Sequence, residues 1–404
     1  MIYLDNSATT YPKPQGVRQA VQRAFTDFGA NPGRSGYGMC LRTTQAVYQV
    51  RQQAAEFFGA PGPECVLFQP SCTQALNVVL KGFLKPGDHV VITDLEHNAV
   101  TRPLEALKAR GVTYTVAKVS PGDNDATVNA FRQAIGPKTR LAVCTMASNV
   151  FGIRVPVERI AALCHQYDVA LCVDAAQGAG LFPIHMGESG IDYLCCAGHK
   201  GLYGPMGTGL LLVREPERLL GTLVEGGTGT QSRSFQMPQE APERYESGTV
   251  NVPGILGLGA GLEFVRRRGV ERICQEELQK LRYLHGRLSR LGKVTLYTPP
   301  PEERFSAPVL SFNLRASPAS GWGSSWPRGA SPCAAACTAR PWPTRSWAPW
   351  RQAPCGCPPR PLPGRRTWTP WPPGSPGGGN KFRESRKNFF YLRFFYAIIL
   401  CRKP

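Results

Sequence analysis

Tryptophan is missing from the first 320 residues of this 404-residue chain, and all seven Trp residues lie beyond that point. Acidic residues are scarce towards the C-terminus, where residues 316–404 hold 14 Lys and Arg residues against one acid, Glu384. That segment therefore carries a net charge of +13, whereas residues 1–315, with 33 basic and 27 acidic residues, carry +6. The total of +19 at first suggests nucleic-acid binding, but most of it lies outside the first 315 residues, and we expect no nucleic-acid partner.

Targeting signals and long apolar runs are also lacking. Met1–Asp5 passes directly into polar and turn residues, which is unlike a secretory signal peptide. Phe389–Leu400 is an apolar run of only 12 residues, whereas a membrane-spanning helix needs about 20. We therefore expect a cytoplasmic protein without a membrane segment, whose 14 cysteines are mostly reduced and form no disulfide framework.

The chain changes character near Arg315. Beyond it the helix and strand patterns disappear, and 15 of the 37 Pro residues lie after residue 320. A disordered Pro-rich segment is one interpretation. We favour a frameshift, because starting each codon on the third base of the displayed one permits a patterned sequence that contains Leu-His-Cys-Ala-Pro and Val-Arg-Val-Ser. Residues 380–404 change again to Lys, Asn, Phe, Tyr and Ile, as expected of read-through past a missed stop codon.

Short apolar runs alternate with helical segments up to residue 315, which predicts an α/β fold with a mostly parallel sheet. The predicted strands are Val66–Phe68, Val90–Thr93, Tyr114–Val119, Leu141–Thr145, Ala170–Val173, Tyr193–Cys196, Gly209–Val213 and Val294–Tyr297. The predicted helices are Thr43–Phe58, Thr73–Leu80, Arg102–Ala109, Ala126–Ala134, Val157–Tyr167, Pro253–Arg267 and Glu276–Leu291. We divide the chain into an N-terminal segment (1–20), a large domain (21–252), the start of a small C-terminal domain (253–315) and an out-of-frame tail (316–404).

A Gly-rich turn, Cys196–Pro205, follows the predicted strand Tyr193–Cys196 and presents Lys200. A lysine at such a turn can form a Schiff base with an aldehyde cofactor once burial or a nearby cation lowers its pKa. Asp174 directly follows the predicted strand Ala170–Val173, where a buried acid needs a partner such as a protonated pyridine nitrogen. Taken alone, Lys200 could equally be a surface side chain, and Asp174 could equally cap a helix.

Further polar clusters border other predicted elements. Gln69–Gln74 leads into a helix, whose free N–H groups and dipole favour a phosphate, although its Ser and Thr could equally be plain N-caps. His97, after another strand, could stack on a flat ring or be a solvated loop residue. Asn149 ends a strand with an amide, and Tyr245–Asn251 is a polar loop before a helix. Each signal is weak alone, so the argument depends on their combination.

In this order and spacing, the motifs resemble the cysteine desulfurase and selenocysteine lyase group of the class V aminotransferase-fold enzymes. Tyr3–Thr10 is similar to the N-terminal motif of that group, and the resemblance covers residues 1–315. It implies the type I fold of the transferases that depend on pyridoxal 5'-phosphate (PLP), with a large domain built on a mostly parallel sheet. It also implies a smaller C-terminal α/β domain, which is incomplete here, and a homodimer.

The resemblance implies catalytic roles for Lys200 and His97. Lys200 would hold PLP covalently and move the α-proton of the substrate, and His97 would stack on the ring and assist that proton transfer. Asp174 would pair with the pyridine nitrogen, and Gln177 would donate a hydrogen bond to the ring oxygen.

The resemblance also assigns the phosphate and the substrate. Residues at the helix start and in the Lys200 turn would hold the phosphate, namely Cys72, Thr73 and His199. Thr249 would reach the phosphate of the neighbouring subunit. Asn149 would lie near the cofactor and the substrate amino acid, and Asn6 near the substrate. No metal site is expected.

The chain departs from the family in the phosphate loop and at its end. Ala197 stands where the family often has a phosphate-binding Ser, and Ser71 and Cys72 replace small residues. The nucleophilic Cys and the Arg for the substrate carboxylate occur only in the shifted frame, and Cys337 lies near the nucleophile's place without its flanking residues. We therefore expect a cysteine desulfurase that is inactive in this reading. An intact one would convert L-cysteine (or selenocysteine) to L-alanine and pass sulfur through an enzyme persulfide to an acceptor protein, for example in iron–sulfur cluster assembly.

Two other hypotheses stay open. One is a selenocysteine lyase or an aminotransferase of the same fold, which the release of alanine and sulfide would distinguish from a desulfurase. The other is a non-catalytic PLP-binding or basic scaffold protein, whose nucleic-acid binding would depend strongly on salt.

Overall fold

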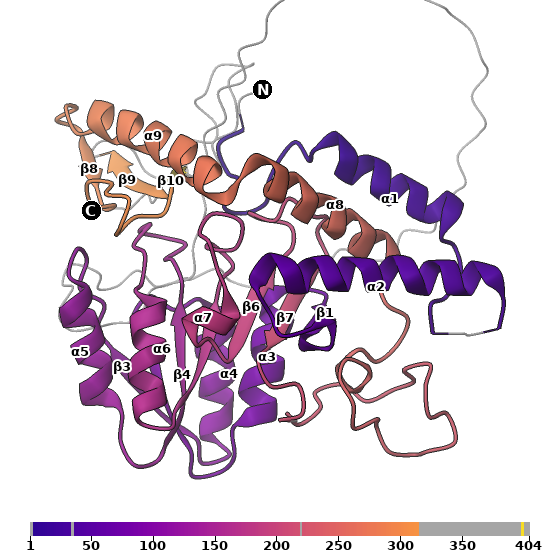
Figure 1. The fold of residues 1–404 in the computed structure, drawn as a ribbon. Helices are drawn as coiled ribbons and strands as arrows, with labels where there is room; N and C mark the ends of the chain where they lie inside the picture. Colours follow the sequence, from indigo (N-terminus) through magenta and orange to yellow (C-terminus); the bar gives the residue numbers. More distant parts are fainter. Residues whose placement is uncertain (1–2, 34–35, 219, 315–396, 400–404) are drawn as a thin grey trace, which may run out of the picture. The chain divides into compact units, whose positions relative to one another are not determined.

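The computed structural model describes residues 3–33, 36–218, 220–314 and 397–399, all of which belong to one structural unit. At its centre is a seven-stranded sheet of order β1-β7-β6-β5-β4-β2-β3 (Figure 1). The strands are β1 (Val66–Gln69), β2 (His89–Thr93), β3 (Thr113–Ala117), β4 (Thr139–Thr145), β5 (Ala170–Asp174), β6 (Tyr193–Ala197) and β7 (Gly209–Val213). Only β7 runs antiparallel to its neighbours, β1 and β6. The prediction of an α/β fold with a mostly parallel sheet is confirmed.

The strands are apolar on both faces because helices cover both faces. In β2, for example, Val90 and Ile92 point into one buried cluster and Val91 into another, as the two-residue period of a strand requires. Helices α3 and α4 pack on the first face, and α5 and α6 on the second. Their bounds are α3 (Cys72–Phe83), α4 (Asn98–Lys108), α5 (Asn124–Ala134) and α6 (Val157–Gln166). The observed bounds of these helices differ from the predicted ranges by a few residues.

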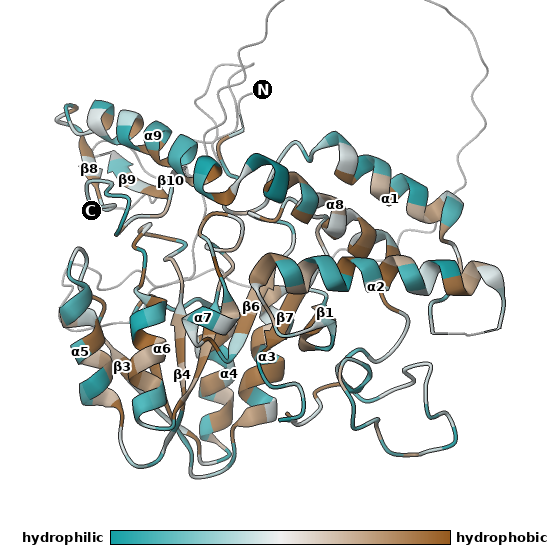
Figure 2. Cartoon of the chain, viewed as in Figure 1, coloured by the Kyte–Doolittle hydropathy of each residue, from teal (hydrophilic) through white to brown (hydrophobic). Residues whose placement is uncertain are grey.

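The remaining helices are α1 (Gln15–Asp27), α2 (Gly38–Phe58), α7 (Met186–Ser189), α8 (Val252–Arg268) and α9 (Val270–Leu288). Helices α1 and α2 both pack against α8 (Figure 1). The sequence pattern did not predict α1 and α7. Strands β6 and β7 are almost uniformly brown in Figure 2, whereas α2 and α9 carry both hydrophilic and hydrophobic residues, as amphipathic helices do.

A second sheet follows α9, with strand order β10-β9-β8. It consists of β8 (Val294–Leu296), β9 (Leu310–Leu314) and β10 (Ala397–Ile399), and β10 runs parallel to β9. The domain boundaries stay a prediction. The predicted frameshift, the Pro-rich segment and Cys337 all lie outside the described residues.

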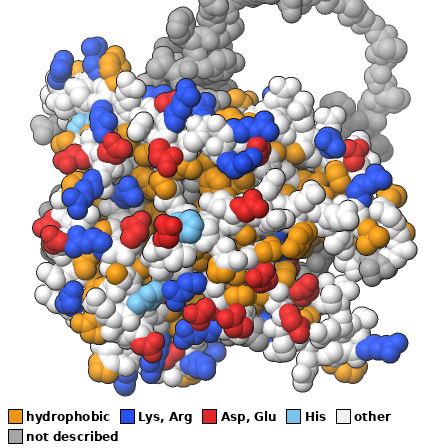
Figure 3. All heavy atoms as spheres, in the orientation of Figure 1, with side chains coloured by type: hydrophobic (Ala, Val, Ile, Leu, Met, Phe, Trp, Pro, Cys, Tyr) orange, Lys and Arg blue, Asp and Glu red, His pale blue; other side chains and the backbone are white. Residues whose placement is uncertain are grey.

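Charges of both signs are interspersed on the face shown in Figure 3, with apolar side chains between them. Within the described residues, no helix is both long and apolar enough to cross a membrane. The nine described cysteines are all buried and free of disulfides.

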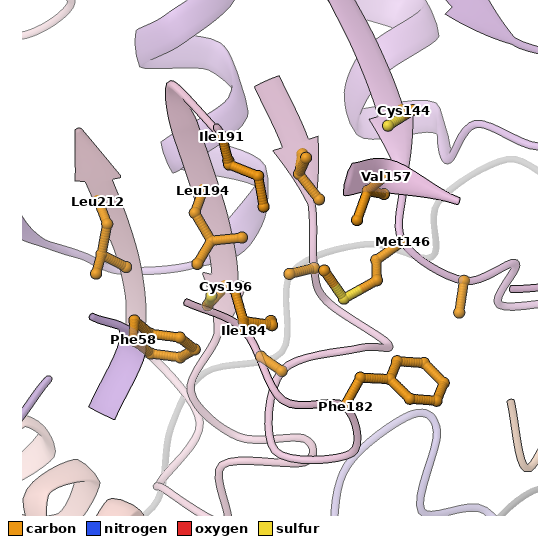
Figure 4. Close-up of a cluster of buried hydrophobic side chains, with 14 of the residues drawn as sticks. Phe58, Cys144, Met146, Val157, Phe182, Ile184, Ile191, Leu194, Cys196 and Leu212 are labelled. Atoms are coloured by element: carbon orange, nitrogen blue, oxygen red, sulfur yellow. The ribbon is translucent and has the colours of Figure 1, made fainter. Parts of the chain in front are cut away.

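The larger core lies between the sheet and the helices of the second face. Figure 4 shows side chains of β6 and β7 facing loop residues there, and the labelled ones include Leu194, Cys196, Leu212, Met146, Phe182 and Ile184. Phe58, at the end of α2, is fully buried in the same cluster (Figure 4). This core fixes the strands whose carboxyl ends form the site described next.

Candidate active site

The carboxyl ends of β5 and β6 place an acid and a lysine at the same edge of the sheet. Asp174 is the last residue of β5, and Lys200 follows β6 by three residues. Because neighbouring parallel strands end at one edge, and Asp174 pairs with Cys195 in the register of β5 and β6, the turn after β6 starts near Asp174. The electrostatic influence of Asp174 on Lys200 reflects this proximity.

Asp174 is 4 % exposed, and its two carboxylate oxygens differ. Oδ1 accepts hydrogen bonds from the Ala176 N–H (2.9 Å) and the Cys72 thiol (3.4 Å). Oδ2 has no hydrogen-bond partner among the described residues. A buried carboxylate with one free oxygen is suited to a cationic N–H partner.

Burial lowers the pKa of Lys200, because a desolvated ammonium is less stable than the neutral amine. Asp174, Cys72 and Asp5 oppose this shift, in that order. A lysine with a lowered pKa has more of the neutral amine that nucleophilic attack on an aldehyde requires.

The backbone carbonyl of His199 is held by several hydrogen bonds from the N-terminal segment. Its carbonyl accepts hydrogen bonds from the N–H and hydroxyl of Thr10, from the Thr9 hydroxyl, and from Lys13 Nζ at 2.7 Å. Nδ1 of the ring is buried and has no hydrogen-bond partner among the described residues. Burial, then Lys200 and Lys13, lower the pKa of His199 to about 4, so the ring is neutral near pH 7. Burial also lowers the pKa of Lys13 to about 8.

The N-terminus of α3 offers free N–H groups beside Asp174. Ser71 is the N-cap, and its hydroxyl accepts from the Gln74 N–H at 3.1 Å, so for Ser71 the simple capping interpretation holds. The N–H groups of Cys72 and Thr73 have no hydrogen-bond partner in the described part of the chain. Cys72 is predicted to hold the phosphate, and its thiol donates to Asp174 and to the Cys195 carbonyl. Only the backbone N–H of Cys72 is therefore available to an anion at this helix end.

His97 is the N-cap of α4, and its ring is exposed. Nδ1 accepts a hydrogen bond from the Ala99 N–H at 3.0 Å, which leaves the ring proton of the neutral form on Nε2. Burial lowers the pKa of His97, Asp174 raises it, and Lys200 and then Arg102 lower it further. His97 thus belongs to the same electrostatic group as Lys200 and Asp174.

Glu96, next to His97, was not predicted as a site residue. Its Oε1 accepts from the Thr93 hydroxyl (2.6 Å) and from the Thr145 N–H (2.8 Å), while the buried Oε2 has no partner in the part of the chain that the structure describes. Burial raises the pKa of Glu96 to about 8, so the carboxyl is largely protonated at neutral pH. An acid followed by histidine after a strand was the available signal, but the sequence does not show that Glu96 points inward.

The three predicted amide side chains, Gln177, Asn6 and Asn149, differ in burial and in hydrogen bonding. Gln177 donates from Nε2 to the Ser7 carbonyl at 3.3 Å, and its Oε1 is buried without a partner. Asn6 is 5 % exposed, and its Oδ1 accepts from the Tyr11 N–H at 2.8 Å, so the N-terminal segment closes on itself beside Gln177. Asn149 is half-buried in the turn after β4.

Thr249 lies in a different hollow from the residues around Lys200. This hollow has a volume of about 300 Å³ and is lined by the end of β1, the start of β7 and the loop after residue 244. The Thr249 hydroxyl accepts from Asn31 Nδ2 at 3.1 Å. Thr73 and His97 share another hollow, of about 380 Å³, between α3 and α4.

These residues fit a pyridine ring that carries a phosphate and an aldehyde. His199 Nδ1, which is buried without a partner among the described residues, can donate to a phosphate oxygen, and the free N–H groups of α3 also suit the phosphate. The arrangement defines a candidate site for an aldehyde cofactor.

The family comparison agrees with this geometry. The family model described as aminotransferase class-V matches residues 2–320. A probable cysteine desulfurase of Methanothermobacter thermautotrophicus is 31% identical, and the match covers 78% of each chain. A cysteine desulfurase of Klebsiella pneumoniae is 32% identical, again over 78% of each chain. The chain therefore belongs to the aminotransferase class-V family, whose cofactor is PLP, and within it to the cysteine desulfurase group.

Some relatives are much longer than the matched part. The chain spans 46% of a probable cysteine desulfurase of Mycolicibacterium paratuberculosis, to which it is 35% identical over 78% of its own length. Among solved structures, the apo cysteine desulfurase of Thermococcus onnurineus has a TM-score of 0.73 at 28% identity, covering 80% of this chain and 81% of that one. A cysteine desulfurase of Escherichia coli has a TM-score of 0.69 at 26% identity, covering 80% of this chain and 81% of that one. The type I fold of the PLP-dependent transferases is thereby confirmed.

Proposed function

We propose that the edge of the central sheet around Lys200 and Asp174 binds PLP and that the encoded activity is a cysteine desulfurase. The observation that carries this proposal is the pair itself, a half-buried lysine whose pKa is lowered by desolvation and a buried carboxylate with one free oxygen that acts on it electrostatically. The cofactor, when bound, supplies an electron sink for the α-carbon of an amino acid. Lys200 would hold it covalently, and Asp174 would hold the pyridine N–H.

The other residues of the site would bind and orient. The N–H groups of Cys72 and Thr73 would hold the phosphate together with His199. Gln177 would bind the ring oxygen, since one N–H of its amide is not used by Ser7. The His97 ring, with its Nδ1 already occupied, would stack on the cofactor.

Proton transfer and substrate contact fall to four residues. Lys200, whose pKa is lowered by burial, and His97 Nε2 would move the α-proton. Asn149 would contact the cofactor and the substrate, and Asn6 would lie near the substrate. The relatives' names and a solved neighbour in complex with cysteine support L-cysteine as the substrate. Selenocysteine lyase and aminotransferase chemistry remain the alternatives.

We further propose that this chain cannot complete sulfur transfer. All nine described cysteines are buried, and burial raises the pKa of seven of them. None of these nine therefore presents the exposed thiolate that attack on a substrate sulfur requires. The family match ends at residue 320, close to the change of composition near Arg315, which supports the frameshift hypothesis.

A homodimer and a sulfur-acceptor protein belong to the same proposal. Helix α2 exposes four large apolar side chains, Tyr37 at its N-cap and Met39, Leu41 and Tyr48 within it, each more than half exposed. Such a patch supports contact with a second copy. The position of Thr249 away from the Lys200 turn supports its predicted reach to a neighbour's phosphate. The cytoplasmic location remains a prediction.

The proposal is tested by assaying two proteins side by side, the chain as written and a chain with the frame restored after Arg315. Both are loaded with PLP and given L-cysteine and a reductant, and alanine and sulfide are measured. We expect both to bind PLP and only the restored chain to turn over. Sulfide from the chain as written would contradict the loss of sulfur transfer, and absence of PLP binding by either would contradict the cofactor site.

A further inference from the structure

A buried ion pair joins helix α2 to the loop that carries Thr249. Arg51 Nη1 and Nη2 donate to Glu246 Oε1 and Oε2, each at 2.7 Å, so the pair is bidentate. The two side chains are only 7% and 8% exposed. The loop carrying Glu246 and Thr249 is thus fixed to the middle of a 21-residue helix.

The same pair is also bonded to strand β1. Glu246 Oε1 accepts from the Phe68 N–H at 2.6 Å, and Arg51 Nη1 donates to the Val66 carbonyl. The guanidinium lies over the Phe68 ring at 4.5 Å from its centroid. Strand β1 ends at Gln69, three residues before α3 and its free N–H groups begin. One ion pair therefore connects the Thr249 loop to the strand that leads into the α3 N-terminus.

One further hydrogen bond joins β1 to the Thr249 loop, and the two segments also line the same hollow. Gln69 Nε2 donates to the Tyr245 carbonyl at 3.5 Å, and Glu246 and Thr249 both line the 300 Å³ hollow. A buried ion pair is a costly way to stabilise a fold, because desolvation offsets most of the attraction, and apolar residues of similar size often do as well. Fixing the position of a segment is a better-attested use of such a pair.

We propose that the Arg51–Glu246 pair is a positioning device for the cofactor phosphate. It holds the α3 N-terminus, which would contact the phosphate of the same subunit, in register with the Thr249 loop, which would reach the phosphate of a neighbouring subunit. This inference rests on the proposed PLP site. It predicts that disturbing the pair weakens binding of the phosphate far more than binding of the ring and aldehyde.

The test compares PLP with pyridoxal, which lacks the phosphate, on the full chain. Glu246→Gln keeps the size and the acceptor for the Phe68 N–H but removes the negative charge. Arg51→Lys keeps the positive charge but cannot form the bidentate contact. We expect the Kd for PLP to rise by about tenfold or more in both variants and the Kd for pyridoxal to change by less than about twofold. Arg214→Lys, which alters an ion pair with Asp192 at the opposite edge of the sheet, should change neither.

An equal loss of PLP and pyridoxal affinity would show that the pair serves general stability, and no loss of either would also overturn the proposal. Hydrogen exchange on the cofactor-free protein provides a second readout. The Gly248 N–H, which donates to the Gly227 carbonyl at 2.8 Å, should exchange faster in both variants, while the amides of α5 should not change. Unchanged exchange there would contradict the positioning role even if the wild-type chain bound no PLP. Failure of wild-type binding alone would overturn only the proposed function.

Discussion

The two edges of the central sheet use buried polar groups in opposite ways. At the amino-terminal edge, Asp192 accepts from the Leu171 N–H (2.7 Å), His165 (3.2 Å) and Arg214 (2.6 Å), so both carboxylate oxygens are partnered. At the carboxyl-terminal edge, buried atoms of Glu96, Gln177 and His199 have no partner within the described residues. Buried polar groups that are hydrogen-bonded within the protein stabilise the fold. Buried polar groups without a partner are available to bind a ligand.

The largest effect should come from exchanging one carboxylate for an amide at each edge. Asp192→Asn removes the nearer of the two carboxylate partners of Arg214 and leaves it only the more exposed Glu215 at 3.5 Å. It should lower the free energy of unfolding by about 3 kcal/mol, with no effect on PLP affinity. Asp174→Asn should change the stability of the cofactor-free protein by less than about 1 kcal/mol but weaken PLP binding by about tenfold or more. Urea unfolding and cofactor titration measure both effects. If the two variants lost stability equally, the distinction between the edges would be wrong.

The next effect is a pH dependence that only the carboxyl-terminal edge should show. The folded-state pKa of Glu96 is raised to about 8 from its ordinary value of 4.5, so the folded chain binds more protons than the unfolded chain between these values. Glu96 therefore makes the cofactor-free protein less stable as the pH rises from about 5 to 8. His199, with a pKa of about 4 against an ordinary 6.5, has the opposite effect between pH 4 and 6.5.

Glu96→Gln isolates the first contribution because it is neutral at every pH and keeps the acceptor for Thr93. Its gain in stability over the wild type should grow by about 3 kcal/mol between pH 5 and pH 8, as measured by urea unfolding. A constant difference between the two proteins across this range would mean that Glu96 is already ionised at pH 5.

The smallest effect concerns Ser71, a satisfied group at the otherwise unsatisfied edge. Ser71→Ala removes the cap of α3 and should lower the free energy of unfolding by about 1 kcal/mol. Asp123→Ala, which removes the cap of α5, should have a similar effect and serves as the matched control. PLP affinity should fall by less than about twofold in both. A large loss of affinity in Ser71→Ala alone would give its hydroxyl a binding role.

The sequence predicted the sheet well because local patterns determine strands and strand ends. The predicted start of every strand of the central sheet lies within two residues of the observed one, and the acid and the lysine after two adjacent strands do meet. It did not predict α1, whose sequence carries few apolar residues, or the direction of the Cys72 thiol. Contacts between distant segments are also beyond local patterns, as the Arg51–Glu246 pair shows with its separation of 195 residues.

The most direct test of this account is to trap the cofactor on the protein. The chain is incubated with PLP, reduced with borohydride, digested and analysed by mass spectrometry. We predict a pyridoxyl adduct on Lys200 and none on Lys13, although burial also lowers the pKa of Lys13 to about 8. An adduct on Lys13, or the absence of any adduct on Lys200, would contradict the assignment of the cofactor site to the carboxyl-terminal edge of the sheet.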